Sequence, residues 1–232
     1  MDLFCSIYSD VDKGRRFFHR FITLEGIEGC GKSTQAKLLA ASLENEGFNV
    51  FLTREPGWGV LGKKIRQLVL HSEQGSIDTV AETLLFMADR AQHVRRGILP
   101  ALLEGKVVIS DRYHDSTVAY QGFGLKSNFP RSNALEACYQ WLGCHPGRTY
   151  WLDVPVNVAL ERVYKRSQGL REGDEAPSKF DVAEEAFHRR VREGFLYVAR
   201  KDPRRVVPVD GAQPVERVHE VLRRDALSYL NA

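Results

Sequence analysis

The chain has 232 residues, of which 43% are hydrophobic, and a net charge of +3, which suits one globular domain with its own core. The charge is too small to predict a nucleic-acid partner and suits an anionic small-molecule substrate equally well. No apolar run approaches the ~20 residues of a membrane span, and the N-terminus lacks the apolar core of a signal peptide. The cysteines have no C-x-x-C spacing and are typical of reduced intracellular thiols. We therefore expect a cytoplasmic protein with neither a membrane nor a nucleic acid as partner.

Residues 21–25 form the first expected strand and lead into the most informative motif of the chain. Residues 1–19 are expected to be an extension ahead of a single domain over 20–232. The loop reads GIEGCGKS, a G-x-x-x-x-G-K-S pattern between a β-branched run and a helical pattern. Its glycines allow backbone N–H groups to converge on phosphate oxygens, at the positive end of the next helix. The predicted nucleotide-phosphate site consists of Gly26, Ile27, Glu28, Gly29, Cys30, Gly31, Lys32, Ser33 and Thr34.

Two side chains of this loop have specific chemistry. Lys32 can reach the outer phosphates, and the Ser33 hydroxyl can ligate Mg²⁺. The helix that follows is expected over 32–46, ending at Gly47. Its expected buried stripe is Leu38, Leu39 and Leu43.

Later strand-like runs recur between helical patterns, and each ends in a polar or charged residue. They cover 50–54, 107–111, 149–153 and 206–210. Their β-branched and aromatic content predicts fully buried parallel strands. The alternation predicts an α/β fold with a doubly wound, five-stranded parallel sheet and helices on both faces. Because ligands bind at the carboxyl ends of such strands, the polar strand ends should share one rim.

Strand ends also supply a carboxylate and two guanidinium groups. Asp111 should lie beside the phosphate loop, where it can hold Mg²⁺ directly or through water. Arg112 follows it, and Arg54 ends the second strand. Each guanidinium can grip a phosphate bidentately. Such a pair suits an acceptor phosphate that faces a donor nucleotide.

Two further segments have features that suggest a function, namely a helical region over 79–104 and a charged loop over 167–178. Phe86 and Arg90 are four residues apart and share one helical face. They could stack on a planar base and bond to its edge, or they could be a core Phe and a surface Arg. The loop is rich in Gly, Pro and charge, which is typical of a plain surface loop or of a mobile lid.

With these motifs in place, the chain resembles the bacterial thymidylate kinases, a family of phosphate-loop nucleoside monophosphate kinases. The matching segments are LEGIEGCGKST, TREPG, LLFMADRAQH, SDRYHDSTVAYQG and TYWLDVPVNVALER. The resemblance extends from about residue 21 to the last strand and helix. It implies transfer of the ATP γ-phosphoryl group to dTMP with Mg²⁺, giving dTDP for dTTP synthesis. It also implies a P-loop NTPase fold with a mobile lid over about 166–181, and a homodimer.

The resemblance implies a role for each residue that matches a family motif. Phe86 would stack on thymine, Arg90 would donate to its O4, and Tyr120 would exclude a ribose 2′-hydroxyl. Arg162 would lie near adenine. The full acceptor site would be Arg54, Phe86, Arg90, Arg112, Ser116, Thr117, Tyr120 and Gln121. The metal ligands would be Ser33 and Asp111, and the catalytic residues would be Lys32, Arg112, Asp111, Glu28 and Arg171.

Departures from the family pattern modify these expectations. Trp58 follows TREPG, where relatives have a small residue, and adds bulk beside the acceptor site. Cys30 stands where some relatives have an arginine, so the cation for the transition state is expected from the lid. Arg171 is the first candidate, followed by Lys179 and Arg166.

Other functions remain open at this point. Another monophosphate kinase of the same architecture is one, although Phe86, Arg90 and Thr117 favour a pyrimidine. A GTP-driven switch is a second, but the chain has neither an N-K-x-D nor a D-x-x-G run. A third is a phosphate-loop protein that has lost catalysis and only binds its ligand. The loop lysine, the strand-end carboxylate and the arginines argue against this alternative.

Overall fold

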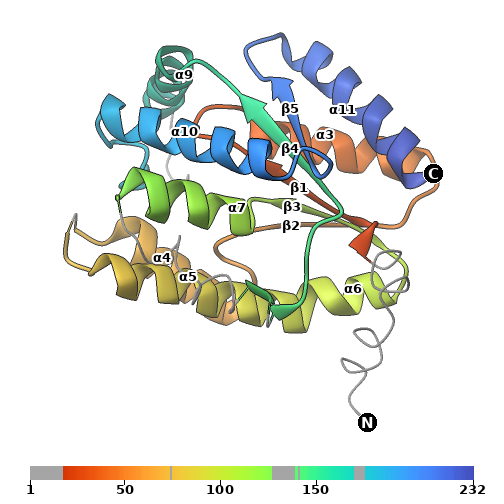
Figure 1. Cartoon of the computed structure of the whole chain (residues 1–232), viewed down its shortest axis with the longest axis horizontal. Helices are drawn as coiled ribbons and strands as arrows, with labels where there is room; N and C mark the ends of the chain where they lie inside the picture. The colour runs from red at the N-terminus through yellow and green to blue at the C-terminus, as the bar shows by residue number, and fades with distance from the viewer. Residues whose placement is uncertain (1–17, 74, 127–138, 141, 170–175) are drawn as a thin grey trace.

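A five-stranded parallel sheet forms the centre of the computed structural model, which describes residues 18–73, 75–126, 139–140, 142–169 and 176–232 (Figure 1). The strands are β1 (Phe21–Glu25), β2 (Val50–Arg54), β3 (Val107–Asp111), β4 (Arg148–Asp153) and β5 (Val206–Asp210). Their order is β2-β3-β1-β4-β5, and every neighbouring pair is parallel. The predicted α/β fold class is therefore confirmed, with β4 beginning one residue earlier than expected.

The prediction that all five strands are fully buried is wrong for the two edge strands. Every residue of β1 and β3 is buried, whereas only Thr53 is buried in β2, and only Val206 and Val209 are buried in β5. Leu52 of β2, for example, is 40% exposed. A central strand has a partner on both sides and helices over both faces, and an edge strand has fewer neighbours.

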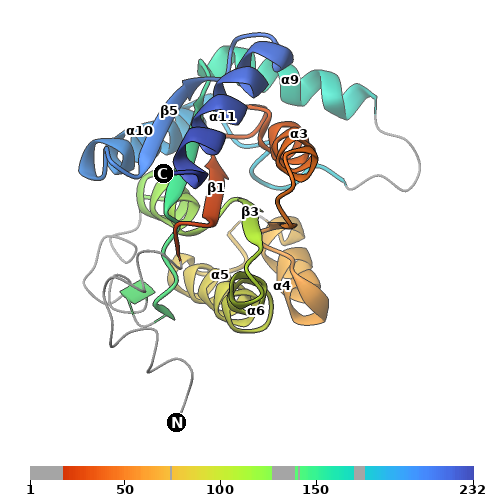
Figure 2. The ribbon, with the colours of Figure 1, turned by 90° about the vertical axis from the view of Figure 1, so that its right-hand side faces the viewer.

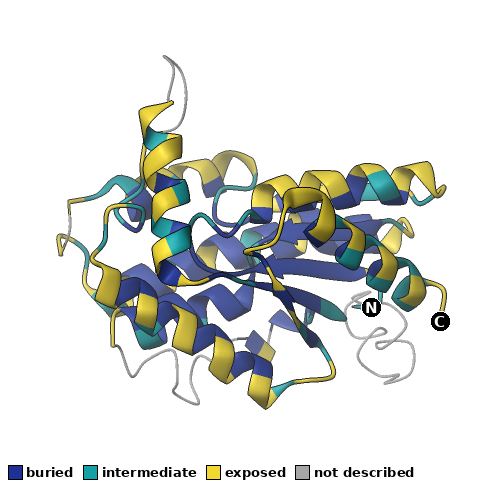
Figure 3. Ribbon diagram, turned by 90° about the horizontal axis from the view of Figure 1, so that it is seen from above, coloured by how far each residue is buried: buried dark blue, intermediate teal, exposed yellow. Residues whose placement is uncertain are grey.

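Helices cover both faces of this sheet (Figure 2). On one face α3 packs against α11, and on the other α10 packs against η2. The sheet is consequently the most deeply buried layer of the molecule (Figure 3). The helical elements are α3 (Lys32–Asn45), α4 (Gly59–His71), α5 (Thr79–His93), η1 (Val94–Ile98), α6 (Leu99–Leu103), α7 (His114–Thr117), η2 (Val118–Gly124), α9 (Val156–Gln168), α10 (Glu185–Lys201) and α11 (Val215–Leu230).

Helix α3 buries a different stripe from the one expected. Leu39 and Leu43 are fully buried, but Leu38 is 36% exposed. The buried positions Gln35, Leu39 and Leu43 are four residues apart, and Leu38 lies to one side of that line. The helix ends at Asn45, and Gly47 follows in a left-handed conformation, φ 86°, as a helix-end glycine does.

The helical region expected over 79–104 is present as three consecutive elements. Helix α5 begins after Asp78, whose carboxylate accepts from Val80 N at 2.8 Å. It continues into the π-helical segment η1 and then α6 without a loop. None of the helices in the described residues is both long enough and apolar enough to span a bilayer.

Candidate active site

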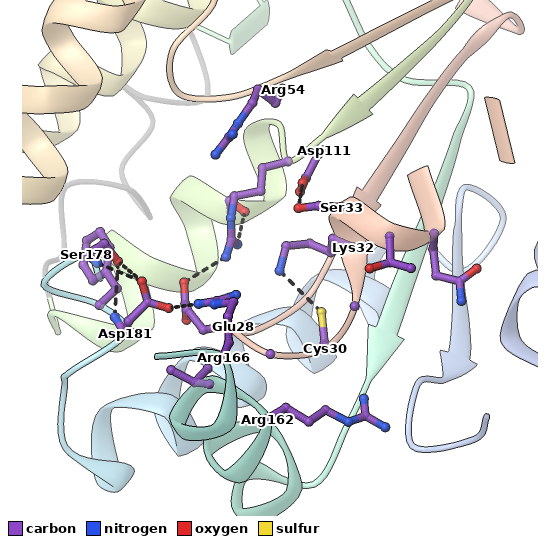
Figure 4. A pocket seen from close by; sticks show the side chains of 18 of the residues that line it. Glu28, Cys30, Lys32, Ser33, Arg54, Asp111, Arg162, Arg166, Ser178 and Asp181 are labelled. Atoms are coloured by element: carbon purple, nitrogen blue, oxygen red, sulfur yellow. Dashed lines mark hydrogen bonds and ion pairs between the residues drawn. The ribbon is translucent and has the colours of Figure 1, made fainter. Parts of the chain in front are cut away.

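A cavity of about 1040 Å³ lies at the carboxyl ends of the strands, as the strand-end residues predicted (Figure 4). It is lined by the phosphate loop, by the ends of β2 and β3, and by one face of α5. Helices η2 and α9 and the residues that follow β5 complete the wall. All the expected acceptor residues line it: Arg54, Phe86, Arg90, Arg112, Ser116, Thr117, Tyr120 and Gln121. The cavity is thus large enough for two ligands and brings both predicted sites together.

The phosphate loop has its shape because glycine is required where it approaches other backbone. A Cβ on Gly29 would lie 2.2 Å from the carbonyl oxygen of Ala159, and one on Gly26 would lie 2.7 Å from that of Leu152. Both glycines also have positive φ, at 75° and 142°. Residues 28–34 of the loop line the cavity, and Gly26 and Ile27 lie just behind them.

Lys32 is buried and folded back on its own loop. Its Nζ donates to the carbonyl oxygens of Gly26 at 3.0 Å and Ile27 at 2.8 Å, and contacts Cys30 Sγ at 3.4 Å. An ammonium group has only N–H donors and no acceptor. To bind an outer phosphate, Lys32 would therefore exchange loop carbonyl oxygens for phosphate oxygens.

Ser33 and Asp111, the expected metal ligands, are in direct contact. Ser33 Oγ donates to Asp111 Oδ2 at 2.5 Å, across the neighbouring ends of the phosphate loop and β3. A hydroxyl and a carboxylate are hard oxygen ligands of the kind Mg²⁺ prefers. The described residues hold no cluster of three or more metal-binding side chains here. Because both side chains offer hard oxygen atoms, the pair fits Mg²⁺, whose remaining ligands would be nucleotide phosphates and water.

Arg112 is held in a buried cluster with Glu28 and Tyr120. Its Nη2 donates to Glu28 Oε1 at 2.8 Å and to Tyr120 Oη at 3.0 Å. The Tyr120 hydroxyl donates in turn to Glu28 at 2.7 Å. Burial alone would raise the pKa of Glu28, but Arg112, with His188, Lys32 and Tyr120, lowers that pKa to about 2. The carboxylate is therefore charged and paired.

Glu25, at the end of β1, was expected only as one of the polar residues at the strand-end rim, and in the structure it bonds residues next to this cluster. It accepts from Tyr113 N at 2.7 Å and from Ser116 Oγ at 2.6 Å. Ser116 Oγ also accepts from Arg112 at 3.1 Å. Burial, reinforced by the nearby Asp115, raises the pKa of Glu25 to about 7. Its only sequence signal was a carboxylate at a strand end.

Phe86 and Arg90 share a face of α5 as expected, and both are buried. Arg90 is 2% exposed, which excludes the alternative of a surface arginine. Its Nε donates to Glu55 Oε2 at 2.8 Å, and its Nη1 donates to Thr117 Oγ1 at 2.9 Å. The arginine thus joins α5, the turn after β2, and α7 at one wall of the cavity.

A second row of polar side chains behind Arg90 escaped the sequence analysis. Glu55 Oε1 lies 2.9 Å from His93 Nδ1, and His93 Nε2 lies 2.8 Å from Thr53 Oγ1. Asp89 accepts from Gly57 N at 3.2 Å, and burial together with Glu55 raises its pKa to about 6. These groups fix Glu55 and therefore the arginine that it binds.

Trp58 is not beside the acceptor site, contrary to expectation. Its ring stacks on His93 with centroids 5.4 Å apart, and it does not line the cavity. A Cβ on Gly97 would lie 2.8 Å from the indole, so the glycine makes room for it. Trp58 therefore packs behind the site, against the row of polar side chains.

The lid candidates lie in three different situations. Arg171 falls outside the described residues. Arg166 lines the cavity and donates to Asp181 Oδ1 at 2.6 Å. Lys179 does not line the cavity and forms an ion pair with the buried Glu82. The contacts of Lys179 thus argue against it as the cation for the transition state and leave Arg166 and Arg171.

Arg162 lies on the opposite side of the phosphate loop from the acceptor residues (Figure 4). Its Nη1 donates to the carbonyl oxygen of Gly211 at 2.8 Å and its Nη2 to that of Ala212 at 3.3 Å. A Cβ on Gly211 would lie 2.7 Å from Val154. Arg162 and the turn after β5 thus form one end of the cavity, and the expected place of adenine beside Arg162 stays a prediction.

Comparisons with known proteins agree with this geometry. The family model for thymidylate kinase matches residues 24–222. Thymidylate kinase of Geotalea uraniireducens is 39% identical over 210 residues, which cover 90% of this chain and 97% of that protein. The Syntrophotalea carbinolica thymidylate kinase is 43% identical over 198 residues, which cover 85% of this chain and 90% of that protein. A crystal structure of the Ehrlichia chaffeensis thymidylate kinase superimposes with a TM-score of 0.64 at 32% sequence identity. The match covers 89% of this chain and 97% of that one. This chain therefore belongs to the thymidylate kinase family.

Proposed function

We propose that this chain transfers the γ-phosphoryl group of ATP to dTMP, with Mg²⁺, in the cavity at the strand ends. One observation carries the proposal: the same cavity holds a phosphate loop and, facing it, a second site with two arginines and a buried aromatic wall. Relatives that share about 40% identity over most of the chain are named thymidylate kinase. Phosphoryl transfer depends mainly on positioning and charge neutralisation, which such a site supplies.

The donor nucleotide binds along the phosphate loop in this proposal. Backbone N–H groups and Lys32 hold its phosphates, and Arg162 lies near its adenine. Ser33 and Asp111 hold Mg²⁺, which neutralises charge on the β- and γ-phosphates. The contact between these two residues in the structure supports the assignment.

The acceptor dTMP occupies the opposite end of the cavity. Arg54 and Arg112 bind its phosphate, Phe86 stacks on thymine, and Arg90 donates to the base edge beside Thr117. Gln121 and Ser116 complete the polar wall, and Tyr120 lies against the sugar. The support is spatial, because these side chains come from β2, β3, α5, α7 and η2 and line one cavity.

Wider properties of the chain are part of the same proposal. We place the protein in the cytoplasm, in keeping with the free, buried thiols of Cys30 and Cys144. The lid remains a proposal for about residues 166–181, of which 170–175 lie outside the described residues. The active form is a homodimer that pairs through α4 and α5. Exposed apolar side chains of those helices support this, namely Val60, Leu61, Leu68, Val80 and Leu84.

A coupled assay for ADP tests the proposed reaction. ATP and Mg²⁺ are offered with dTMP, dUMP, dCMP or dGMP, and dTMP should give the highest kcat/KM. Lys32→Ala should lower kcat by about 10³-fold or more without loss of helical circular dichroism, since the lysine neutralises charge on the transferred group. Wild-type protein that forms no ADP from dTMP at any Mg²⁺ concentration would contradict the proposal.

A further inference from the structure

His188 on α10 is fully buried and makes no hydrogen bond of ordinary length, although from 3.6 Å away it already helps to lower the pKa of Glu28. Its exposed fraction is 0%, and within the described part of the chain neither Nδ1 nor Nε2 is bonded. An imidazole always has at least one N–H donor. Leaving such a group unpaired in the interior costs free energy, so a folded protein that keeps one calls for a physical explanation.

The imidazole faces the phosphate loop. His188 Nδ1 lies 3.6 Å from Glu28 Oε2, slightly beyond the length of a hydrogen bond. The histidine cannot easily move away, because α10 is fitted closely to η2. A Cβ on Gly194 would lie 2.7 Å from Ala119 Cα, and one on Gly124 would lie 2.7 Å from the Phe187 ring. A small shift of Glu28 toward α10 would therefore complete the bond.

Glu28 has two other partners, and one of them has a second task. Tyr120 and Arg112 both donate to its carboxylate, at 2.7 and 2.8 Å. To grip the acceptor phosphate with two N–H groups, Arg112 must give up at least one of its present bonds, because Nη1 and Nη2 already donate to Gly26 O, Ser116, Glu28 and Tyr120. If the bond given up is the one to Glu28, the carboxylate loses its ion pair. A buried carboxylate that loses its cation is strongly destabilised unless another donor replaces it. His188 is a buried donor without a hydrogen bond, and its Nδ1 lies 3.6 Å from the carboxylate.

We propose that His188 is a positioning residue that takes over Glu28 when Arg112 turns to the acceptor phosphate. The inference rests on the proposed function, since it requires Arg112 to bind the phosphate of dTMP. The Nδ1–H tautomer or the imidazolium would donate to Glu28 Oε2, while Tyr120 keeps its own bond. His188 thereby lowers the free energy needed to release Arg112, although it touches neither substrate.

A purely structural role makes a different prediction. His188 follows Phe187, whose ring stacks on Phe180 with centroids 5.7 Å apart. If the imidazole only fills this aromatic cluster, its loss should disturb thymidine and dTMP binding alike. If the imidazole instead helps to release Arg112 from Glu28, its loss should weaken the binding of dTMP, which carries a phosphate, and leave thymidine binding unchanged.

The test compares the affinities of His188 variants for dTMP and for thymidine by titration calorimetry. His188→Leu removes the donor, and His188→Asn keeps an N–H donor close to the position of Nδ1. We expect His188→Leu to weaken dTMP binding by about 10-fold, the size of one charge-assisted hydrogen bond. Thymidine binding should change less than 2-fold, and His188→Asn should recover most of the dTMP affinity.

Two further variants make the result specific. In a Glu28→Gln background, His188→Leu should no longer affect dTMP binding, because the carboxylate charge is gone. His219 of α11 is a matched control, since its Nδ1 is also buried without a partner but lies away from the cavity. His219→Leu should leave both affinities unchanged. If His188→Leu does not fold, His188→Phe keeps a ring and provides the variant without a donor.

The outcomes separate the inference from the proposed function. Wild-type protein that binds dTMP no better than thymidine would contradict the phosphate role of Arg112, and with it the inference. A normal wild-type preference that is unchanged in His188→Leu would overturn the inference alone. Equal losses of affinity for dTMP and thymidine in His188→Leu would also overturn the inference and would assign His188 to a packing role.

Discussion

Arg112, which we propose binds the acceptor phosphate, is held in an ordered position by contacts within the protein. Its backbone has a φ of 75°, which is unfavourable for a residue with a Cβ. The backbone N–H compensates by donating to Leu24 O at 3.0 Å. Its side chain is fixed by Glu28, Tyr120 and the Gly26 carbonyl oxygen. A guanidinium that is already ordered loses less conformational entropy when it binds an anion.

The identity of the lid cation is a prediction at the residue scale. Arg171→Ala should lower kcat by about 10³-fold while changing the Kd for dTMP little, because the charge is needed mainly in the transition state. Arg166→Ala should have a smaller effect, since Arg166 pairs with Asp181. Single-turnover kinetics with saturating ATP, at a series of dTMP concentrations, measure the rate of the chemical step and the Kd for dTMP in each variant. A large loss of kcat in Arg166→Ala, together with a near-normal kcat in Arg171→Ala, would assign the role to Arg166.

Glu25 gives the unfolding free energy a specific pH dependence. Burial raises its folded-state pKa from 4.5 to about 7, so between these values the folded state binds more protons than the unfolded state. Stability therefore falls as pH rises from about 4.5 to 7, by at most ~1.4 kcal/mol per pH unit. Glu25→Gln should remove this slope in urea titrations between those pH values. Parallel curves for both proteins would show that Glu25 does not titrate there.

At the scale of elements, Lys179 and Phe180 in the C-terminal part of the proposed lid are tied to helices that line the cavity. Lys179 N donates to Leu70 O at the end of α4, and the Lys179 ammonium pairs with Glu82 of α5. Glu82 also accepts from Gln121 of η2 at 3.0 Å. Phe180 packs against Tyr120 in the same region. These contacts join residues 179 and 180 to helices α4, α5 and η2, all of which contribute to the wall of the cavity.

The close approach of α10 and η2 predicts a large effect of one methyl group. Gly194→Ala should destabilise the fold by about 1–3 kcal/mol, because the new Cβ would meet backbone at Ala119 that cannot move aside. Gly169→Ala is the control, since its Cβ would meet nothing closer than 3.7 Å. Urea unfolding of both variants measures the difference. A Gly194→Ala protein as stable as the Gly169→Ala protein would show that the helices can separate at low cost.

At the scale of the whole molecule, helices α4 and α5 pack together and expose apolar side chains to solvent. Leu61 and Leu68 are seven residues apart on one face of α4 and are 45% and 50% exposed. Leu84 of α5 is 51% exposed. Apolar surface shared by two packed helices is typical of a subunit interface.

Charge placed on this surface should dissociate the proposed homodimer. Leu61→Glu and Leu68→Glu together should shift the protein toward the monomer in sedimentation velocity, because a buried carboxylate at an apolar interface has no partner. Leu103→Glu on α6 is the matched control, at 47% exposure. A wild-type protein that sediments as a monomer at micromolar concentration would contradict the dimer itself.

The sequence predicted the sheet and the phosphate loop because their signals are local. A β-branched run followed by glycines at fixed spacing specifies backbone geometry wherever it occurs. The polar row behind Arg90 could not be predicted in the same way. Glu55, Asp89 and His93 are separated by up to 38 residues and converge only through the packing of α5 on the turn after β2. Trp58 was misplaced for the same reason, since Gly97 makes room for it from a distant segment.

The stacking of Trp58 on His93 also makes the acceptor site observable with light. The indole is in contact with an imidazole that bonds Glu55, and Glu55 bonds Arg90. Indole emission is sensitive to the charge and polarity of groups in contact with the ring. A ligand that changes the bonds of Arg90 would therefore alter the fluorescence of Trp58 without an added dye. Occupancy of the proposed base site should thus be measurable in real time, and Trp58→Phe identifies the emission that belongs to this indole.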